Sequence, residues 1–502
     1  MSLIKKLAGE TAIYGVSNVL NRLLNYIIVT PYLTRVFNND TEEYGIHGMM
    51  YAFAALLMVL FTYGMETAFF RFGNKAEQRN QVFSTASISL FFTTFLLGGL
   101  LIFFAEPIAI WLDTSDQAAE DSIYVIFFVL IVSFDALSAI PFARLRLENR
   151  PIRFAVLKAI NIIINAAAIF FFLEGCPWLI EQGYEWGHTF YDSDRKLDYV
   201  FIANLIASAC TLLLLLPIYF KIPLRFDAAI WKKMLWYALP LIVVGVAGMI
   251  NQLADRILIP KLLTGTPEEN RAQLGIYNAS VKIAVLISLF TQAFKFAAEP
   301  FFFRHSDRTD SKIIYAQVGQ AFALVGSLAF LGLLLYLDLF QFLIASNFRE
   351  GLVIAPVMLL AYLFLGLYFN FSIWYKLTDK TYIGAYISIG GAVISLSLNF
   401  LLIPRIGYMG AAWAAFSCFL FMAIVSYLIG KAYYPVPYPI GKMVLYILLS
   451  VGVWWISELL RPMVNESLVQ LLLLNTGLLL FYLASIALVE RKLVKAWLFK
   501  KR

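Results

Sequence analysis

The sequence has few of the residues that hold metal ions or form disulfides. Its 502 residues include only three cysteines and three histidines. The cysteines are too few and too widely separated for a disulfide framework or a zinc site, and the histidines show no metal-ligand spacing. They are Cys176, Cys210 and Cys418, and His47, His188 and His305. We therefore predict that the protein binds no metal ion.

Nucleotide-binding motifs are also missing. The sequence contains neither a Walker loop nor a glycine-rich dinucleotide fingerprint, which excludes ATP hydrolysis by this chain alone. We predict no cofactor. One motif, Asp192-Ser193-Asp194, has the D-x-D form that metal-dependent membrane glycosyltransferases use. The predicted outer loop that contains it, about 174–198, is too short for a catalytic domain. We interpret the motif as part of a solvated acidic loop and predict that the protein is not an enzyme.

Charged residues are scarce as well. They make up 14% of the chain, whereas hydrophobic residues make up 61%, and the mean hydropathy is +0.77. These values lie outside the range of soluble globular proteins and within that of proteins that cross the membrane many times. The composition therefore excludes a large soluble domain.

Fourteen apolar runs are long enough to cross about 30 Å of hydrocarbon as helices. They predict an all-α polytopic membrane protein with about fourteen transmembrane helices. The runs centre on about 12–33, 46–68, 84–105, 122–142, 154–173, 199–220, 236–260, 275–299, 314–337, 352–374, 383–403, 410–430, 441–459 and 468–489.

The charge distribution supports this number of helices, because positive residues stay on the cytoplasmic side of short loops. With the N-terminus inside, Lys and Arg are about threefold more numerous in the cytoplasmic segments than in the outer loops, and the acids show the opposite bias. We predict that both termini are cytoplasmic. The basic tail at 491–502 is typical of a segment attracted to anionic lipid, and we predict no nucleic-acid partner.

The two halves of the chain resemble each other at an offset of about 230 residues. Gly45-Ile46 falls on Gly275-Ile276, and with a three-residue insertion Glu66 falls on Glu299. Duplicated membrane halves are typical of transporters that alternate access around a site between them. We predict an N-terminal lobe at 1–225, a C-terminal lobe at 226–434, and two further helices with a basic tail at 435–502.

Five basic residues lie within the predicted spans, where a Lys or Arg costs about 2.5–3.5 kcal/mol on insertion scales. Asparagines accompany them at 3–4 spacing, which places them on one face of a helix. This pattern predicts a hydrated cationic cavity that binds an anionic group such as a phosphate or pyrophosphate. The basic residues are Arg22, Lys158, Arg256, Lys282 and Lys295, and the accompanying asparagines include Asn21, Asn25 and Asn251.

An alternative is that these residues brace the helices internally. Asp255 would then neutralise Arg256, Glu299 would neutralise Lys295, and the asparagines would cross-link helices. Asp255 is also a candidate for ion coupling, because an intramembrane carboxylate can bind a transported cation.

Three more acids are candidates for gating or ion coupling. Glu66 and Glu299 each precede an arginine by five residues near the cytoplasmic end of a span. A clamp to Arg71 or Arg304 is one interpretation, and an exposed helix-end pair worth about 0–1 kcal/mol is the other. Asp135 lies in mid-span without an evident partner. It indicates either a coupling-ion site or a hydrogen bond to a neighbouring helix.

Four short motifs resemble those of one transporter family. They are Gly9-Glu10-Thr11-Ala12-Ile13-Tyr14-Gly15, Pro31-Tyr32-Leu33-Thr34-Arg35, Glu43-Tyr44-Gly45 and Arg146-Leu147-Glu148-Asn149-Arg150. The chain resembles the bacterial polysaccharide flippases, the Wzx-type O-antigen and capsule transporters of the multidrug/oligosaccharidyl-lipid/polysaccharide (MOP) exporter superfamily. The resemblance runs over most of the chain and implies a fourteen-helix fold with two pseudo-symmetric six-helix lobes.

This resemblance implies a transporter that flips undecaprenyl-pyrophosphate-linked oligosaccharide across the bacterial inner membrane. The cargo would be a repeat unit of O-antigen, capsule or exopolysaccharide, and the protein would take part in the biosynthesis of that polysaccharide or lipopolysaccharide. Arg22, Lys282, Lys295 and Arg256 would contact the pyrophosphate. The implied partners are the lipid-linked substrate, the bilayer, and the polymerase and ligase machinery of the glycan, and we expect a monomer.

Other cargoes stay open at this point. In lipid II flippases, members of the same superfamily, the cavity arginines cluster on the first, second and eighth helices. Here the second span carries no basic residue before Arg71. A multidrug or metabolite exporter for cationic drugs would have an acid-lined cavity, whereas basic residues outnumber acids in these spans. A non-transporting membrane partner of a polysaccharide polymerase is the alternative of another class.

Overall fold

The computed structural model describes residues 28–74, 77–112, 122–148, 150–184, 191–223, 225–304, 308–378, 380–464 and 467–491. Within these ranges the regular structure is entirely helical. Thirteen helices there are long and apolar enough to cross a membrane. They correspond to the predicted second to fourteenth spans, and the first predicted span, about 12–33, lies mostly outside the described residues. The predicted all-α polytopic membrane fold is confirmed.

Contacts between residues divide the chain into two compact units. The first unit comprises Met1–Asn278 and Ser388–Ala414, and the second comprises Ala279–Ile387 and Ala415–Arg502. This division groups helices by contact, whereas the predicted lobes divide the chain by its sequence repeat, and those lobes stay a prediction. Each unit is described by itself.

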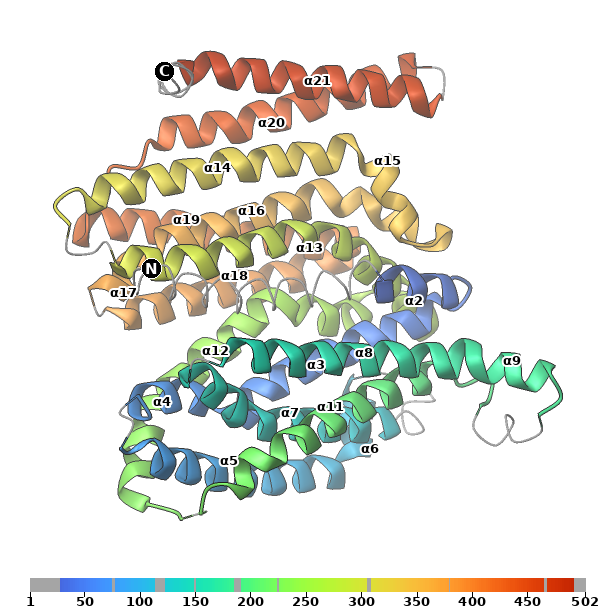
Figure 1. Cartoon of the computed structure of the whole chain (residues 1–502). Helices are drawn as coiled ribbons and strands as arrows, with labels where there is room; N and C mark the ends of the chain where they lie inside the picture. The colour runs from blue at the N-terminus through green and yellow to red at the C-terminus, as the bar shows by residue number, and fades with distance from the viewer. Residues whose placement is uncertain are drawn as a thin grey trace. The chain divides into compact units, whose positions relative to one another are not determined.

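The first unit contains the helices of the N-terminal half and α12 (Figure 1). The beginning of α13 and much of α18 also belong to it. Its elements are α2 (Thr30–Val36), α3 (Thr41–Thr62), α4 (Met65–Phe72), α5 (Arg79–Phe103), α6 (Ala105–Leu112), α7 (Ser122–Leu147), α8 (Pro151–Phe170), the π-helix η2 (Phe171–Gly175), α9 (Cys176–Glu181), α11 (Lys196–Phe220), α12 (Ala228–Leu262), α13 (Pro267–Arg304) and α18 (Thr381–Ile406).

The second unit contains the rest of α13 and the C-terminal helices. In it α14, α20 and α21 pack side by side. Its elements are α14 (Ser311–Leu335), α15 (Leu337–Phe340), the 3₁₀ turns η3 (Gln341–Leu343) and η4 (Ser346–Ile354), α16 (Ala355–Phe371), α17 (Ile373–Leu377), most of α19 (Tyr408–Tyr433), α20 (Ile440–Leu460), η5 (Arg461–Met463) and α21 (Leu468–Val489).

Local sequence explains where several helices begin and break. Asp227 caps α12, since its carboxylate accepts from the backbone N–H groups of Ala229 and Ile230 at 2.9 and 3.0 Å. The predicted second span is broken between α3 and α4, where Tyr63 and Gly64 have φ angles of 32° and 74°. Gly64 tolerates this left-handed conformation because it has no β-carbon. The break makes α4 a separate segment.

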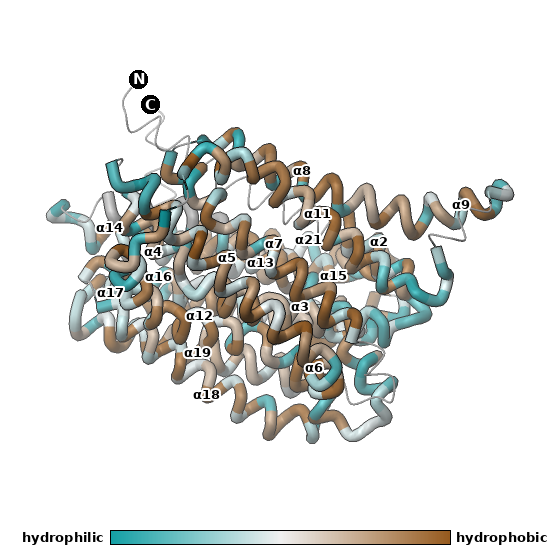
Figure 2. The backbone as a smooth tube through the Cα atoms, turned by 90° about the horizontal axis from the view of Figure 1, so that it is seen from below, coloured by the Kyte–Doolittle hydropathy of each residue, from teal (hydrophilic) through white to brown (hydrophobic). Residues whose placement is uncertain are grey.

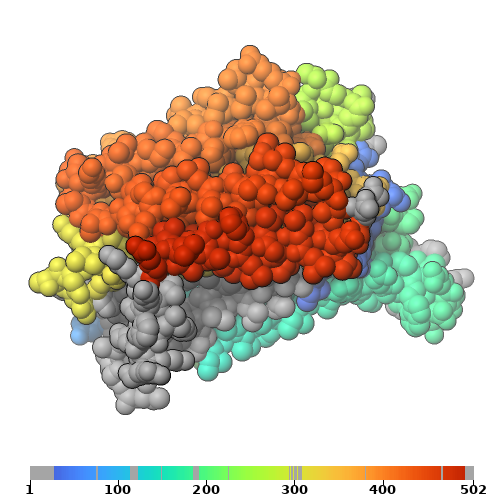
Figure 3. Space-filling view, turned by 90° about the horizontal axis from the view of Figure 1, so that it is seen from above, coloured from blue at the N-terminus to red at the C-terminus, as the bar shows by residue number. Residues whose placement is uncertain are grey.

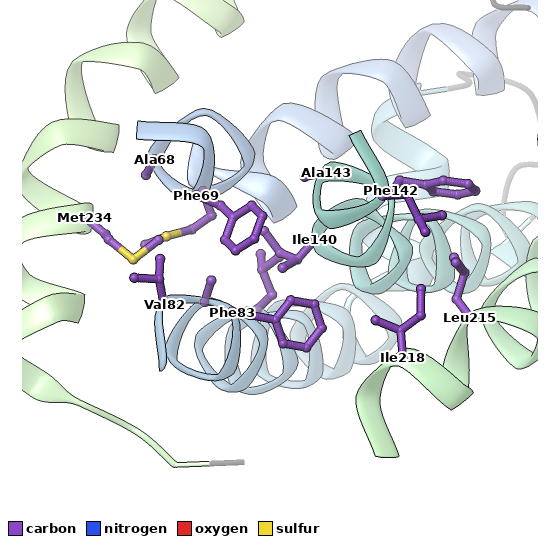
Figure 4. Packing of buried hydrophobic residues seen from close by; sticks show 14 of the residues in the cluster. Ala68, Phe69, Val82, Phe83, Ile140, Phe142, Ala143, Leu215, Ile218 and Met234 are labelled. Carbon is purple, nitrogen blue, oxygen red and sulfur yellow. The ribbon is translucent and has the colours of Figure 1, made fainter. Parts of the chain in front are cut away.

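The apolar residues serve two environments. One set packs inside the first unit, where residues from α4, α5, α7, α11 and α12 form a cluster that includes Phe69, Phe83 and Ile218 (Figure 4). The other set is exposed, and it includes many large hydrophobic side chains. Along the backbone, hydrophobic residues make up most of the helices, while hydrophilic ones gather towards the helix ends (Figure 2). On the face formed by α20 and α21 (Figure 3), Leu448 and Leu473 are 62% and 68% exposed. Such extensive exposed apolar surface is suited to contact with lipid.

Two glycines bring α3 and α13 into backbone contact within the first unit. A β-carbon added to Gly45 would lie 2.1 Å from the carbonyl oxygen of Arg271, and one added to Gly275 would lie 2.0 Å from that of Thr41. Gly275 is the repeat counterpart of Gly45, and Arg271 is the counterpart of Thr41, at the same offset of about 230. The contact is therefore reciprocal, like the self-complementary contact across a two-fold axis.

We predict that Gly275→Ala lowers the thermal stability of the purified protein, because the added methyl group meets a backbone carbonyl that cannot move cheaply. Overpacking of this kind costs about 1–3 kcal/mol, which outweighs the gain of about 1 kcal/mol in helix propensity. The matched control is Gly452→Ala in α20, where a β-carbon meets nothing within 4 Å. Its melting temperature should stay equal or rise. Equal changes in both variants would contradict the tight crossing.

Candidate functional site

Polar residues on one face of α12 form the first group of candidate site residues. Asn251 and Asp255 are one helical turn apart and are 5% and 7% exposed. The amide nitrogen of Asn251 donates to the carbonyl of Ser388 in α18 at 3.0 Å. Asp255 accepts a hydrogen bond from the Tyr277 hydroxyl and another from the backbone N–H of Arg256 at 2.8 Å. These contacts brace α12 against α13 and α18.

Arg256 extends this group towards the glycine crossing. Its Nε donates to Oδ1 of Asn278 at 3.1 Å, and Asp255 attracts it electrostatically. Asn278 packs against Gly48, where a β-carbon would lie only 2.0 Å from the Asn278 amide nitrogen. Asn278 is also the counterpart of Gly48 at the offset of 230, so this contact, like that of Gly45 and Gly275, joins equivalent positions of the predicted repeats. α3, α12 and α13 therefore meet at one polar junction.

A second polar group lies inside the N-terminal helices. The Asp135 carboxylate on α7 is hydrogen-bonded by the Ser208 side chain on α11 and attracted by Lys158 on α8. The Lys158 ammonium also lies 4.3 Å from the centre of the Phe142 ring. The hydrogen bond from Ser208 corresponds to the second interpretation of Asp135, a bond to a neighbouring helix, and its role in ion coupling stays a prediction. Both partners lie on helices later in the sequence, so the residues around Asp135 do not indicate them.

Further hydrogen bonds continue this group across α3, α8 and α11. Asn204 donates to the Tyr51 hydroxyl at 2.8 Å, and Asn161 donates to the Thr211 hydroxyl at 2.9 Å. Tyr51 is close enough to Asp135 to interact with it electrostatically. Asn165 brings a further buried oxygen, which has no hydrogen-bond partner among the described residues. The N-terminal helices thus enclose a polar cluster with one acid and one base at its centre.

Glu66 has a different partner from the one predicted. Its carboxylate pairs with Arg146 on α7, whose guanidinium lies 4.7 Å from the Phe70 ring. Arg71, the predicted partner, instead lies 4.4 Å from the ring of Tyr237 on α12. On α4, Arg71 therefore faces the aromatic residue Tyr237 of α12, whereas Glu66 pairs with Arg146 near the end of α7. The gating role of Glu66 stays a prediction.

The second unit holds the predicted basic residues of α13. Lys282 is half-buried. Lys295 is also half-buried, and its ammonium lies 4.6 Å from the centre of the Phe369 ring on α16. Lys295 and Lys376 line the same small cleft, together with Phe302.

Several predicted residues cannot be placed. Arg22, Asn21 and Asn25 lie outside the described residues. Glu299 falls within α13, but its side chain lies outside the described part of the chain. The cavity and gating roles of these residues stay predictions.

The D-x-D motif forms a local turn. The backbone N–H of Asp194 donates to the Asp192 carboxylate at 3.0 Å, and the N–H of Asp192 meets the Tyr199 hydroxyl at 2.6 Å. Both aspartates are exposed. Among the described residues, no group of three or more His, Cys, Asp or Glu side chains is arranged to hold a metal ion.

Comparison with known proteins places the chain in a family. A family model described as polysaccharide biosynthesis protein matches residues 7–306, which is more than half of the chain. The chain belongs to this polysaccharide biosynthesis protein family. Among curated proteins, none has a sequence that matches.

Several solved transporter structures are similar to this chain in fold. The lipid II flippase MurJ in an inward closed conformation has a TM-score of 0.64 and 14% identity, covering 98% of this chain and 100% of its own. The Vibrio cholerae MATE transporter VcmN in the bent form has a TM-score of 0.56 and 12% identity, covering 88% and 99%. The MATE multidrug transporter DinF-BH has a TM-score of 0.56 and 16% identity, covering 86% and 96%. This member of the polysaccharide biosynthesis protein family therefore has a MOP-type transporter fold and is a transporter rather than an enzyme.

The electrostatic attraction between Asp135 and Lys158 is the interaction that sequence analysis missed in this family member. Both residues were recognised as intramembrane charges, but on separate spans. The missing signal is that the two spans are consecutive and antiparallel, with Asp135 just past the middle of its span and Lys158 in the first half of the next. An acid and a base at similar depth on adjacent helices are expected to pair, because each lowers the desolvation cost of the other.

We predict that Asp135→Asn and Lys158→Met each lower thermal stability, and that the double variant loses less than the sum of the two. The interaction energy from the double-mutant cycle should be about 0.5–3 kcal/mol, as for other residues that interact directly. The measurement is thermal melting of the purified protein in detergent. Lys431→Met, at an exposed position of α19, controls for loss of a lysine. Strict additivity would show that the two charges act independently.

Proposed function

We propose that this transporter flips undecaprenyl-pyrophosphate-linked oligosaccharide from the cytoplasmic to the outer leaflet of the bacterial inner membrane by alternating access. The observation that carries the proposal is the family match over residues 7–306. A polysaccharide repeat unit made on a lipid carrier must cross the membrane before it is polymerised outside. The cargo would be a unit of O-antigen, capsule or exopolysaccharide, and both termini of a monomeric transporter would be cytoplasmic.

The charge of the intramembrane residues supports an anionic cargo. Arg256 donates to an amide oxygen beside Asp255, which attracts it, and the Lys295 ammonium lies against an aromatic ring. Lys282 lies one turn from Asn278 on α13. Together with Arg22, these residues would bind the pyrophosphate, while the polyprenyl tail stays in lipid. Asn21, Asn25 and Asn251 would supply neutral hydrogen bonds to the same headgroup.

The paired acids fit gating and coupling roles. The Glu66–Arg146 pair joins α4 to the cytoplasmic end predicted for α7, and it can open without disturbing α3 because the chain breaks at Tyr63 and Gly64. Glu299 would act at the equivalent point of the second repeat. Asp135 and Asp255 are the candidates for a coupling ion, since each is an intramembrane carboxylate whose partners include a base.

Two cargoes carried by proteins with a similar fold are the competing possibilities. One structural neighbour is a lipid II flippase and others are multidrug transporters. The family match favours a polysaccharide precursor over both, and the excess of basic over acidic residues in the spans disfavours cationic drugs. A non-transporting partner of a polysaccharide polymerase would not need Arg22 or Lys282.

We predict that the wild-type protein restores surface glycan in a bacterium that lacks its polysaccharide flippase, and that Arg22→Ala, Lys282→Ala and Lys295→Ala do not. Loss of a charge-assisted hydrogen bond to the pyrophosphate weakens binding about tenfold or more. The readout is the amount of surface glycan at equal membrane abundance of each variant.

The matched control is Lys233→Ala, at an exposed position near the start of α12. It should complement like the wild type. If the wild-type protein fails to restore several different surface glycans but protects cells from toxic cations, the protein is a multidrug exporter. Full activity of all three variants would contradict binding of the headgroup in a cationic cavity and would favour a non-transporting role.

A further inference from the structure

A cleft of about 170 Å³ opens where α7 ends, α8 begins and α11 ends, within the first unit. It belongs to neither polar group of the candidate site. The charge bias of the loops predicts that this end of the three helices is cytoplasmic. Its volume is far above the roughly 10–15 Å³ that a single water molecule requires. We call it the basic cleft, after the four cations that line it, Arg144, Arg150, Arg153 and Lys221.

The basic cleft has more positive charge than its acid can balance. Glu148 is the acidic residue of its lining. One oxygen of Glu148 lies 2.5 Å from Nε of Arg144, and the other lies 3.1 Å from Nε of Arg150. One carboxylate is thus shared between two guanidinium groups. Arg153 and Lys221 form no ion pair with any of the described residues. The lining therefore carries an excess of about three positive charges.

Arg144 is held in place with one nitrogen unused. Its Nη2 donates to the side chain of Asn80 at 2.9 Å, and its guanidinium lies 5.0 Å from the centre of the Phe83 ring. Its Nη1 is buried and has no hydrogen-bond partner among the described residues. Leaving a buried charged donor unsatisfied is costly, and an anion in the cleft would lower that cost through its negative charge.

The floor of the basic cleft is apolar. Leu145, Ile218 and Ile222 line it, and all three belong to the buried hydrophobic cluster of the first unit, in which Ile218 is labelled in Figure 4. A cationic rim above an apolar floor matches an amphiphile, whose phosphate meets the cations while its glycerol and first methylene groups meet the floor. A fully hydrated inorganic anion would gain nothing from the apolar residues.

We propose that the basic cleft binds a phosphoryl group at the cytoplasmic surface, as the headgroup of an anionic lipid. The same cations would recognise free pyrophosphate, so the two sources are separated by experiment. The proposal concerns a site apart from the central cavity, and its test does not depend on which cargo is flipped.

The test counts lipids bound to the purified full-length protein in neutral detergent by native mass spectrometry. The probes are phosphatidylglycerol, phosphatidylcholine and inorganic pyrophosphate. We expect the wild type to bind one phosphatidylglycerol more tightly than phosphatidylcholine. The double variant Arg153→Gln/Lys221→Gln should bind that phosphatidylglycerol at least tenfold more weakly, because two charged contacts are lost. Both side chains reach solvent, and their removal breaks no ion pair with a described residue.

The matched control is Lys232→Gln/Lys233→Gln, which removes the same charge from exposed positions near the start of α12 that do not line the cleft. It should keep the wild-type affinity. Pyrophosphate that displaces phosphatidylglycerol only at much higher concentration supports the lipid source. If pyrophosphate binds more tightly than phosphatidylglycerol, and Arg153→Gln/Lys221→Gln abolishes that binding, the cleft binds a phosphoryl group of a soluble ligand and not of a lipid. Equal wild-type affinity for both lipids, with no pyrophosphate binding, would overturn the proposal, as would equal weakening in the control.

Discussion

The polar junction of the first unit depends on how closely α3 and α13 approach each other. Gly45 and Gly275 let the two backbones meet, and Gly48 leaves room for the Asn278 side chain beside them. This register places Tyr277 and Asn278 opposite α12, where they reach Asp255 and Arg256. In a bilayer the lipid is as apolar as a leucine side chain, so close packing and interhelical hydrogen bonds must hold helices together. The glycines supply the packing, and the packing positions the hydrogen bonds.

The structure separates intramembrane charges by the kind of partner they have. Asp135 and Lys158 attract each other inside the N-terminal helices, and Asp255 binds a tyrosine and a backbone N–H beside Arg256. The Lys295 ammonium also has an aromatic contact, with the ring of Phe369. A charge with an ionic partner costs less to keep in the membrane and is harder to recruit to a substrate. An aromatic ring attracts a cation without neutralising its charge, so such a contact is compatible with the predicted role in binding phosphate.

The helices were predictable from the sequence because their signal is local. An apolar run of about 20 residues can only be satisfied as a helix in the membrane, and each described span follows such a run. The break at Tyr63 and Gly64 was not predictable in this way, since hydropathy does not report the sign of φ. The partner of Glu66 was missed for a related reason. Arg71 is its neighbour in sequence, but Arg146 is its neighbour in space, and only the packing of α4 on α7 distinguishes them.

The reciprocal contact of Gly45 and Gly275 bears on the origin of the chain. Each repeat has an even number of predicted spans, so both halves enter the membrane in the same orientation, as the two subunits of a parallel homodimer would. In such a single-copy ancestor, one glycine codon would have formed both sides of the crossing. Under the predicted repeat, gene duplication and fusion would have turned one position into two. After such an event either half could diverge near the contact, and Thr41 and Arg271 now differ. A side chain in place of either glycine, however, would collide with a carbonyl oxygen of the other half.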